Sequence, residues 1–185
     1  MADNKKIEEV AVNYVKSAFN GVNNVLPHIS TDDKGVCIDG YLEFYSDESI
    51  SKESLKGEIP VQVKGTLTKL TNSEKLSRSV SMSDLRRYLD TFEGVLYFVV
   101  YMDQKLSPKG IYYKQLLPYD IREILSKPGC SNQKTTHLRF KPLPNDPVRL
   151  SCMCSDFLTD KVKQEGDKGV LMAKGVKPFD DGELQ

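Results

Sequence analysis

The run Val95-Leu96-Tyr97-Phe98-Val99-Val100-Tyr101-Met102 is the most apolar stretch of the chain, and it limits the folds that the chain can adopt. Gly94 precedes the run and Asp103 follows it. A short continuous apolar run between turn residues, rich in β-branched and aromatic side chains, is typical of a strand buried on both faces. The sequence therefore predicts a central strand within a sheet that helices flank.

The other predicted elements alternate between helices and strands. Apolar residues at helical spacing predict a first helix from about Lys5 to Asn20, with Glu8 on the flank of its apolar stripe and Glu9 in solvent. Strands are predicted at about 36–44, 60–70, 77–82, 110–114 and 135–140, and helices at about 84–92 and 119–127. The predicted fold class is α/β, with a central mixed sheet flanked by helices.

A chain of 185 residues is expected to form one main domain, which we place at residues 1–145. Three prolines at positions 142, 144 and 147 suggest a linker, and few apolar residues follow. Phe157 and Leu158 are the exceptions that could dock on the domain. Residues 146–185 are therefore predicted to be a C-terminal extension or linker, with a mobile tail from Lys161 or a link to a partner domain.

The balance of charge counts mildly against a protein that simply coats nucleic acid. The chain has 26 basic and 26 acidic residues, so net charge supplies no long-range attraction to nucleic acid, and any basic surface must be local. No stretch approaches the length of an apolar membrane span, and the N-terminus lacks the apolar core of a signal peptide. The expected location is the cytoplasm, with no membrane partner.

The cysteines and histidines do not form a recognisable catalytic or zinc pattern. Cys152 and Cys154 form a Cys-x-Cys pair, but no second pair follows at zinc-ligand spacing. Cys37 is predicted to be a small core residue. His28 and His137 are far apart in the sequence and lack a nearby nucleophile pattern.

Two neighbouring predicted strands carry the residues with the most chemical potential. Asp39 and Glu43 alternate with apolar residues in the first strand, and Gln62 and Lys64 alternate with valines in the second. If the strands pair, these four side chains can meet on one face. Carboxylates, an amide oxygen and an ammonium group suit a divalent cation, a water and a phosphate. An ordinary solvated face of an antiparallel sheet has the same alternation, and it is the competing interpretation.

The order helix, strand, strand, strand, helix, strand resembles that of the PD-(D/E)XK nuclease superfamily, to which restriction endonucleases and archaeal Holliday-junction resolvases belong. In more detail, Ile38-Asp39-Gly40 with Glu43, then Val61-Gln62-Val63-Lys64-Gly65, then the apolar strand before Ile111-Tyr112-Tyr113, resembles the bacterial DUF4365 family. The resemblance covers about residues 5 to 140. It implies a restriction-endonuclease-like core of order αβββαβ with a βαβ extension.

The resemblance also implies roles for individual residues. Asp39 would be the main ligand of Mg²⁺ or Mn²⁺, with Lys64 orienting the attacking water or stabilising the phosphate in the transition state. Gln62 stands where the commoner motif has an acid and offers only a neutral carbonyl oxygen. Glu8 matches the acidic residue that the superfamily carries on its first helix. The competing interpretation is that Glu8 is an ordinary residue at the edge of the apolar stripe, favoured near a helix N-terminus by the helix dipole. Glu43 could restore the charge that is lost at Gln62.

These residues lead to two functional expectations of different classes. The first is a metal-dependent deoxyribonuclease domain. A role in defence against foreign DNA is inferred from the families with which such domains occur. Such an enzyme could act as a homodimer or with a partner domain. The second is a nuclease-like domain that has lost catalysis and acts as a nucleic-acid-binding or protein-interaction module. A metal-free RNA-binding sheet is a third alternative, but Tyr97, Tyr101, Tyr112 and Tyr113 are more simply core and strand-edge residues.

Overall fold

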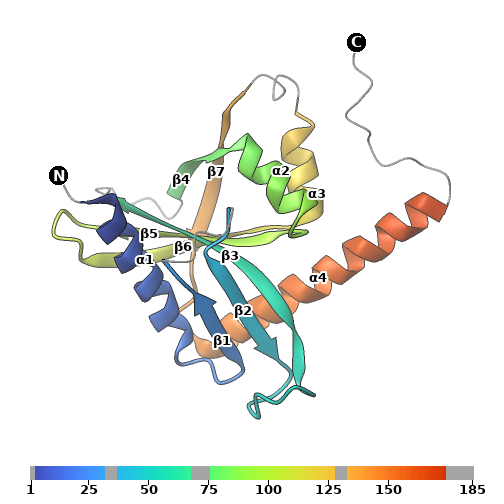
Figure 1. Ribbon diagram of the computed structural model, residues 1–185, viewed down its shortest axis with the longest axis horizontal. Helices are drawn as coiled ribbons and strands as arrows, with labels where there is room; N and C mark the ends of the chain where they lie inside the picture. Colours follow the sequence, from blue (N-terminus) through green and yellow to red (C-terminus); the bar gives the residue numbers. More distant parts are fainter. Residues whose placement is uncertain (1–2, 32–36, 68–75, 128–132, 174–185) are drawn as a thin grey trace.

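The computed structural model describes residues 3–31, 37–67, 76–127 and 133–173 (Figure 1). The helices are α1 (Asn4–Phe19), α2 (Met82–Asp90), α3 (Pro118–Leu125) and α4 (Pro147–Ala173). The strands are β1 (Val25–Ile29), β2 (Gly40–Tyr45), β3 (Leu55–Leu67), β4 (Leu76–Ser81), β5 (Val95–Met102), β6 (Pro108–Leu116) and β7 (Thr135–Pro142). This arrangement confirms the predicted α/β class.

The described strands form one mixed sheet of seven strands in the order β1-β2-β3-β5-β6-β7-β4. Strands β3 and β5 are parallel, whereas the other neighbours are antiparallel. Strand β5 lies in the middle of the sheet, and Val95 to Val100 are all buried. The prediction of a buried central strand is therefore confirmed.

Helices cover both faces of the sheet because β5 sends apolar side chains alternately to each (Figure 1). Leu96, Phe98 and Val100 pack with buried residues of α1 and α4 on one face. Val95 and Val99 pack with α2 and α3 on the other face. We call the second surface the α2 face, since the candidate site described below lies on it.

The strand order differs from the predicted one at the edges of the sheet. Residues 77–82 were expected to be a third strand after 60–70, but β4 pairs with β7 at the opposite edge of the sheet. The sheet instead begins with β1, which contains Pro27 and was not among the predicted strands. An edge strand tolerates proline because one side of its backbone needs no partner.

The prediction of a linker from Pro142 and a tail from Lys161 is wrong for residues 147–173. Pro147 begins the long helix α4, and proline is favoured in a first helical turn because its missing N–H would be unbonded there. Leu150, Met153 and Phe157 are buried against the sheet, and Leu158 packs beside them, as the docking prediction required. The end of α4 extends away from the sheet (Figure 1), and residues 174–185 lie outside the described residues.

The described segments contain no helix that is a candidate for spanning a membrane. None of their helices combines the length and the apolar character that a membrane span needs.

Candidate active site

Asp39 lies directly before β2, at the point where the chain enters the sheet. Its N–H donates to the Val61 carbonyl at 2.8 Å, and its carbonyl accepts from the Ser30 N–H at 2.9 Å. The next residue, Gly40, has φ +145°, and a Cβ at this position would overlap the carbonyl of His28. Only glycine fits such a backbone. The Ile38-Asp39-Gly40 sequence thus holds Asp39 rigidly beside β3.

The Asp39 carboxylate closes the gap that remains where β2 no longer accompanies β3. Its Oδ2 atom accepts the Val63 N–H at 2.7 Å, a donor that a continuing strand would otherwise have bonded. The same oxygen accepts a hydrogen bond from Nε2 of Gln62. The predicted meeting of Asp39 and Gln62 is therefore confirmed.

The Gln62 side chain, in the middle of β3, forms hydrogen bonds through both its nitrogen and its oxygen. Its side chain is only 3 % exposed, and Nε2 also donates to its neighbour's carbonyl, that of Val63, at 3.2 Å. Its Oε1 accepts the hydroxyl of Tyr88 on α2 at 3.5 Å. The amide therefore presents its nitrogen to Asp39 and its oxygen to Tyr88.

Lys64 and Glu8 lie within electrostatic reach of Asp39. Burial raises the pKa of the Asp39 carboxyl, while the Val63 N–H and the positive charge of Lys64 oppose that rise. The negative charge of Glu8 adds to the rise. Lys64 shares the α2 face with Gln62 because the two residues are two positions apart in one strand. The structure thus brings two more of the predicted residues, Lys64 and Glu8, near Asp39.

Glu8 reaches this group because α1 approaches β3 closely. Gly65 follows Lys64, and a Cβ there would meet the Ile7 carbonyl oxygen at 2.9 Å and press on the Ile7 side chain. Glu8 is half-buried whereas Glu9 is exposed, as the helical periodicity predicts. Because Gly65 has no side chain, the N-terminal turns of α1 can lie close to β3, near the Asp39 end of β2.

Glu43 does not join the group, and the prediction that it could is wrong. Its carboxylate lies 3.1 Å from Nε2 of His28 and accepts the Tyr45 hydroxyl at 2.6 Å. Glu43 lies four positions along the chain from Asp39, or roughly 13 Å away at about 3.3 Å per residue. Alternation places two residues on one face, but it does not bring them into contact.

Other charged residues of this region were not predicted to belong to it. Asp84 of α2 accepts a hydrogen bond from the Cys37 thiol at 3.5 Å, and the Arg87 charge acts on the same thiol. On the other side, Arg78 of β4 interacts with the Tyr97 hydroxyl, where burial raises the tyrosine pKa to about 12. The three-residue spacing of Asp84 and Arg87 predicts that they share one flank of a helix. Only the fold shows that this flank packs near Cys37.

The oxygen atoms at Asp39 suit a hard cation, but the arrangement is not a completed metal site. Among the described residues, no three Asp, Glu, His or Cys side chains are grouped as a metal site. Both hydrogen bonds that the described residues donate to this carboxylate end on Oδ2, so Oδ1 could coordinate a cation. The Gln62 amide must turn over before its oxygen faces Asp39. Carboxylate and amide oxygens are nevertheless the donors that Mg²⁺ prefers.

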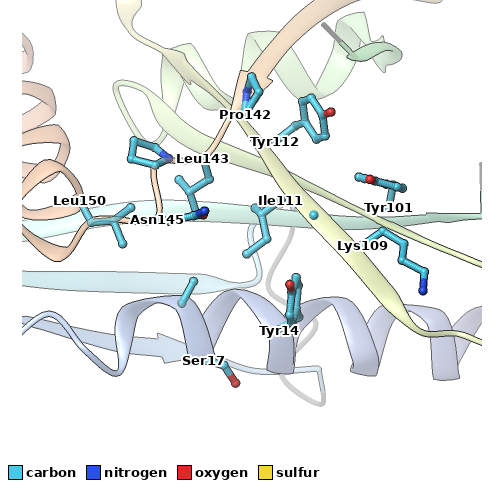
Figure 2. Close-up of a pocket in the computed structure, with 13 residues that line it drawn as sticks. Tyr14, Ser17, Tyr101, Lys109, Ile111, Tyr112, Pro142, Leu143, Asn145 and Leu150 are labelled. Atoms are coloured by element: carbon cyan, nitrogen blue, oxygen red, sulfur yellow. The ribbon is translucent and has the colours of Figure 1, made fainter. Parts of the chain in front are cut away.

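A separate pocket of about 550 Å³ lies between α1, β6 and the segment after β7 (Figure 2). Tyr14, Tyr101 and Tyr112 line it together with Lys109, which forms an ion pair of 3.1 Å with Asp103. The rings of Tyr101 and Tyr112 pack against each other with centroids 5.9 Å apart. None of the pocket residues belongs to the Asp39 group, so the pocket and the candidate site are distinct.

Comparisons with known proteins give no match of any kind. No protein-family model, curated protein or solved structure matches the chain.

Proposed function

We propose that this chain is a metal-dependent nuclease domain that hydrolyses phosphodiester bonds in DNA. The observation that supports this proposal most is the convergence of Asp39, Gln62 and Lys64 from two paired strands, with the Glu8 charge acting on Asp39 from α1. These are the side chains on which the resemblance to PD-(D/E)XK nucleases rests. The coarse architecture, a mixed sheet with helices on both faces, is compatible with that core.

Asp39 and Gln62 would hold Mg²⁺ or Mn²⁺, with Glu8 contributing directly or through a water. When bound, such an ion neutralises charge that develops on the phosphate and makes the attacking water more acidic. The charge balance of the site supports this assignment. Burial disfavours the ionised form of Asp39 and Glu8 repels it, whereas the positive charge of Lys64 favours it. A second positive charge would therefore stabilise the ionised carboxylate.

Lys64 would act on the phosphate rather than on the ion. Its ammonium group lies on the same face as the Gln62 amide and carries three donors. It could hold an oxygen of the phosphate and stabilise the charge that grows there in the transition state. In this role, Lys64 is a catalytic residue, and its loss affects the reaction more than the fold.

A second candidate is an inactive nuclease-like module, and one observation favours it. Asp39 already satisfies two donors, the Val63 N–H and the Gln62 amide, so its carboxylate has a structural role that needs no metal. Gln62 is a neutral residue, which weakens cation binding relative to a second carboxylate. In that case, the Asp39–Gln62 pair would simply close the edge of β3.

Titration of Mg²⁺ and Mn²⁺ by calorimetry separates the two candidates. We compare the parent with Asp39→Asn, because asparagine retains an acceptor for the Val63 N–H while it loses the charge. The nuclease proposal predicts cation binding that weakens at least tenfold in Asp39→Asn. Equal binding by both proteins, or no binding by either, supports the inactive module and contradicts the proposed enzyme.

A further inference from the structure

We propose that Arg87 extends the positive charge of Lys64 into a cationic edge beside Asp39, and that Arg87 binds the DNA backbone phosphate next to the one that Lys64 holds. This inference rests on the proposed function, because it assigns the part of the substrate that would lie next to the reacting phosphate. Neither residue needs to contact the ion.

Two contacts place the Arg87 flank of α2 near the entry to β2. Leu85 and Tyr88 are buried against the α2 face, and the Tyr88 hydroxyl reaches Gln62. Asp84 lies on the same flank as Arg87 because residues three apart in a helix are neighbours. The Asp84 carboxylate accepts the thiol of Cys37, which is two residues before Asp39. Arg87 therefore lies on the helix flank nearest to the candidate site.

Arg87 and Lys64 both lie near Cys37. Both cations lie within electrostatic reach of the Cys37 thiol, which bonds Asp84 on the same helix flank as Arg87. Lys64 also acts on Asp39. Cys37 thus lies near one cation from the helix and one from the strand, and the strand cation, Lys64, also lies near Asp39.

These cations have no carboxylate partner among the described residues. Every ion pair within 4 Å in those segments involves other side chains, and Asp84 bonds the thiol instead of Arg87. Arg87 is exposed and Lys64 is half-buried. Unpaired cations that border a carboxylate site are suited to an anion, and the guanidinium fork binds phosphate oxygens in pairs.

The chain has zero net charge, so such a local edge would supply the attraction that the whole molecule lacks. Arg86 provides a matched comparison, since it is the adjacent residue of α2, has the same charge and is also exposed. It points about 100° away around the helix, and no contact connects it to Cys37 or Asp39 in the described structure.

Binding of a short fluorescein-labelled DNA duplex, and of its single strand, tests this inference. The full chain is titrated in EDTA, so that cleavage cannot interfere, at several salt concentrations. Arg87→Ala should weaken binding about tenfold and reduce the slope of log affinity against log salt by about one, as loss of one phosphate contact requires. Arg86→Ala should stay within about twofold of the parent, and Arg87→Lys should retain the slope. Melting temperatures check that each variant is folded.

Equal losses in Arg87→Ala and Arg86→Ala, or an unchanged Arg87→Ala, would overturn the inference. It would also fail if the parent binds inorganic phosphate but neither DNA probe, or binds nothing. Failure of the proposed function looks different. If Arg87→Ala weakens DNA binding while the parent cleaves no DNA with Mg²⁺ or Mn²⁺, the cationic edge stands and the nuclease activity does not.

Discussion

The Asp39 carboxylate and the Gln62 amide are bonded to each other across the paired strands, with Asp39 Oδ2 as the acceptor. This relationship has two consequences. It holds both side chains in one place before any ligand arrives, and it turns the Gln62 oxygen towards Tyr88. A cation that uses both residues must therefore compete with the hydrogen bond that joins them.

Lys64→Ala should abolish cleavage while the fold and cation binding stay close to the parent's. Lys64 is assigned to the phosphate and is not a ligand of the ion, so its loss removes transition-state stabilisation of about 3 kcal/mol, or more than a hundredfold in rate. Lys56→Ala is a matched control, because Lys56 is an exposed lysine of the same strand. Cleavage rates of the two variants, with calorimetric titration of Mg²⁺, check this prediction. Parent-like cleavage by Lys64→Ala would show that the site is assigned wrongly.

Gln62→Glu should destabilise the metal-free protein and strengthen cation binding. The new carboxylate would be buried beside Asp39, where two negative charges repel and neither is fully solvated. We expect the free energy of unfolding in EDTA to fall by about 2 kcal/mol, since that is a typical cost of burying an unpaired polar group. Millimolar Mg²⁺ should recover much of this loss, because a ligand that binds only the folded state stabilises it. Thermal unfolding with and without Mg²⁺ measures both effects, and a variant that Mg²⁺ does not stabilise would contradict the assigned ligands.

Glu43→Gln should leave cation binding unchanged, in contrast to Glu8→Gln. Glu43 bonds to Tyr45 and His28, whereas Glu8 acts on Asp39. Calorimetric titrations of Mg²⁺ with the two variants provide the comparison. Weaker binding in Glu43→Gln alone would mean that the described geometry is not the geometry that binds the ion.

Glu43→Gln should also change how stability depends on pH. The hydrogen bond from Tyr45 and then the contact with His28 hold the pKa of Glu43 below its ordinary value. A group with a lowered folded-state pKa stabilises the protein above its unfolded-state pKa, and this contribution is lost as the pH falls through the folded-state value. Glu43→Gln should therefore be less stable than the parent at neutral pH, with a difference that starts to shrink below the ordinary glutamate pKa of about 4.3 and vanishes below the lowered folded-state pKa. Urea unfolding at several pH values checks this trend, and a difference that grows in acid would contradict it.

Gly65→Ala should push α1 away from β3 and weaken cation binding as well as stability. The new methyl group would meet the Ile7 backbone and the end of the Met102 side chain, and overpacking of this kind costs about 1–3 kcal/mol. Gly21→Ala is the control, because nothing lies within 4 Å of a Cβ at that position. Unfolding by urea and titration of Mg²⁺ on both variants measure the effect. A Gly65→Ala protein as stable as Gly21→Ala would show that the close approach of α1 is not required.

The sequence predicted the parts of this molecule that depend on local periodicity. The eight-residue apolar strand β5, the flank position of Glu8 and the shared face of Gln62 and Lys64 follow from the repeats of strands and helices. The same periodicity failed for Glu43, because it assigns a face and not a distance. It also missed α4, where Pro147 begins a helix that the preceding prolines had suggested was a linker.

Contacts between distant segments could not be predicted in this way. Asp84 and Arg87 lie more than forty residues from Cys37 in the sequence, and only the packing of α2 on the sheet brings them near it. Strand β1 is identified by its pairing with β2 in the structure. Its sequence alone does not predict a strand clearly, because it contains Pro27. Such residues are specified by the whole fold, and no short window of sequence contains that information.

Cleavage of DNA by the parent and by Asp39→Asn, side by side, tests the proposed nuclease site most directly. Single-stranded, double-stranded and branched DNA, with RNA for comparison, are incubated with Mg²⁺, with Mn²⁺ or with EDTA. We expect metal-dependent cleavage of DNA that EDTA stops and that Asp39→Asn loses. Cleavage that persists in Asp39→Asn, or a parent that cleaves no DNA while it remains folded, would contradict a nuclease site at Asp39.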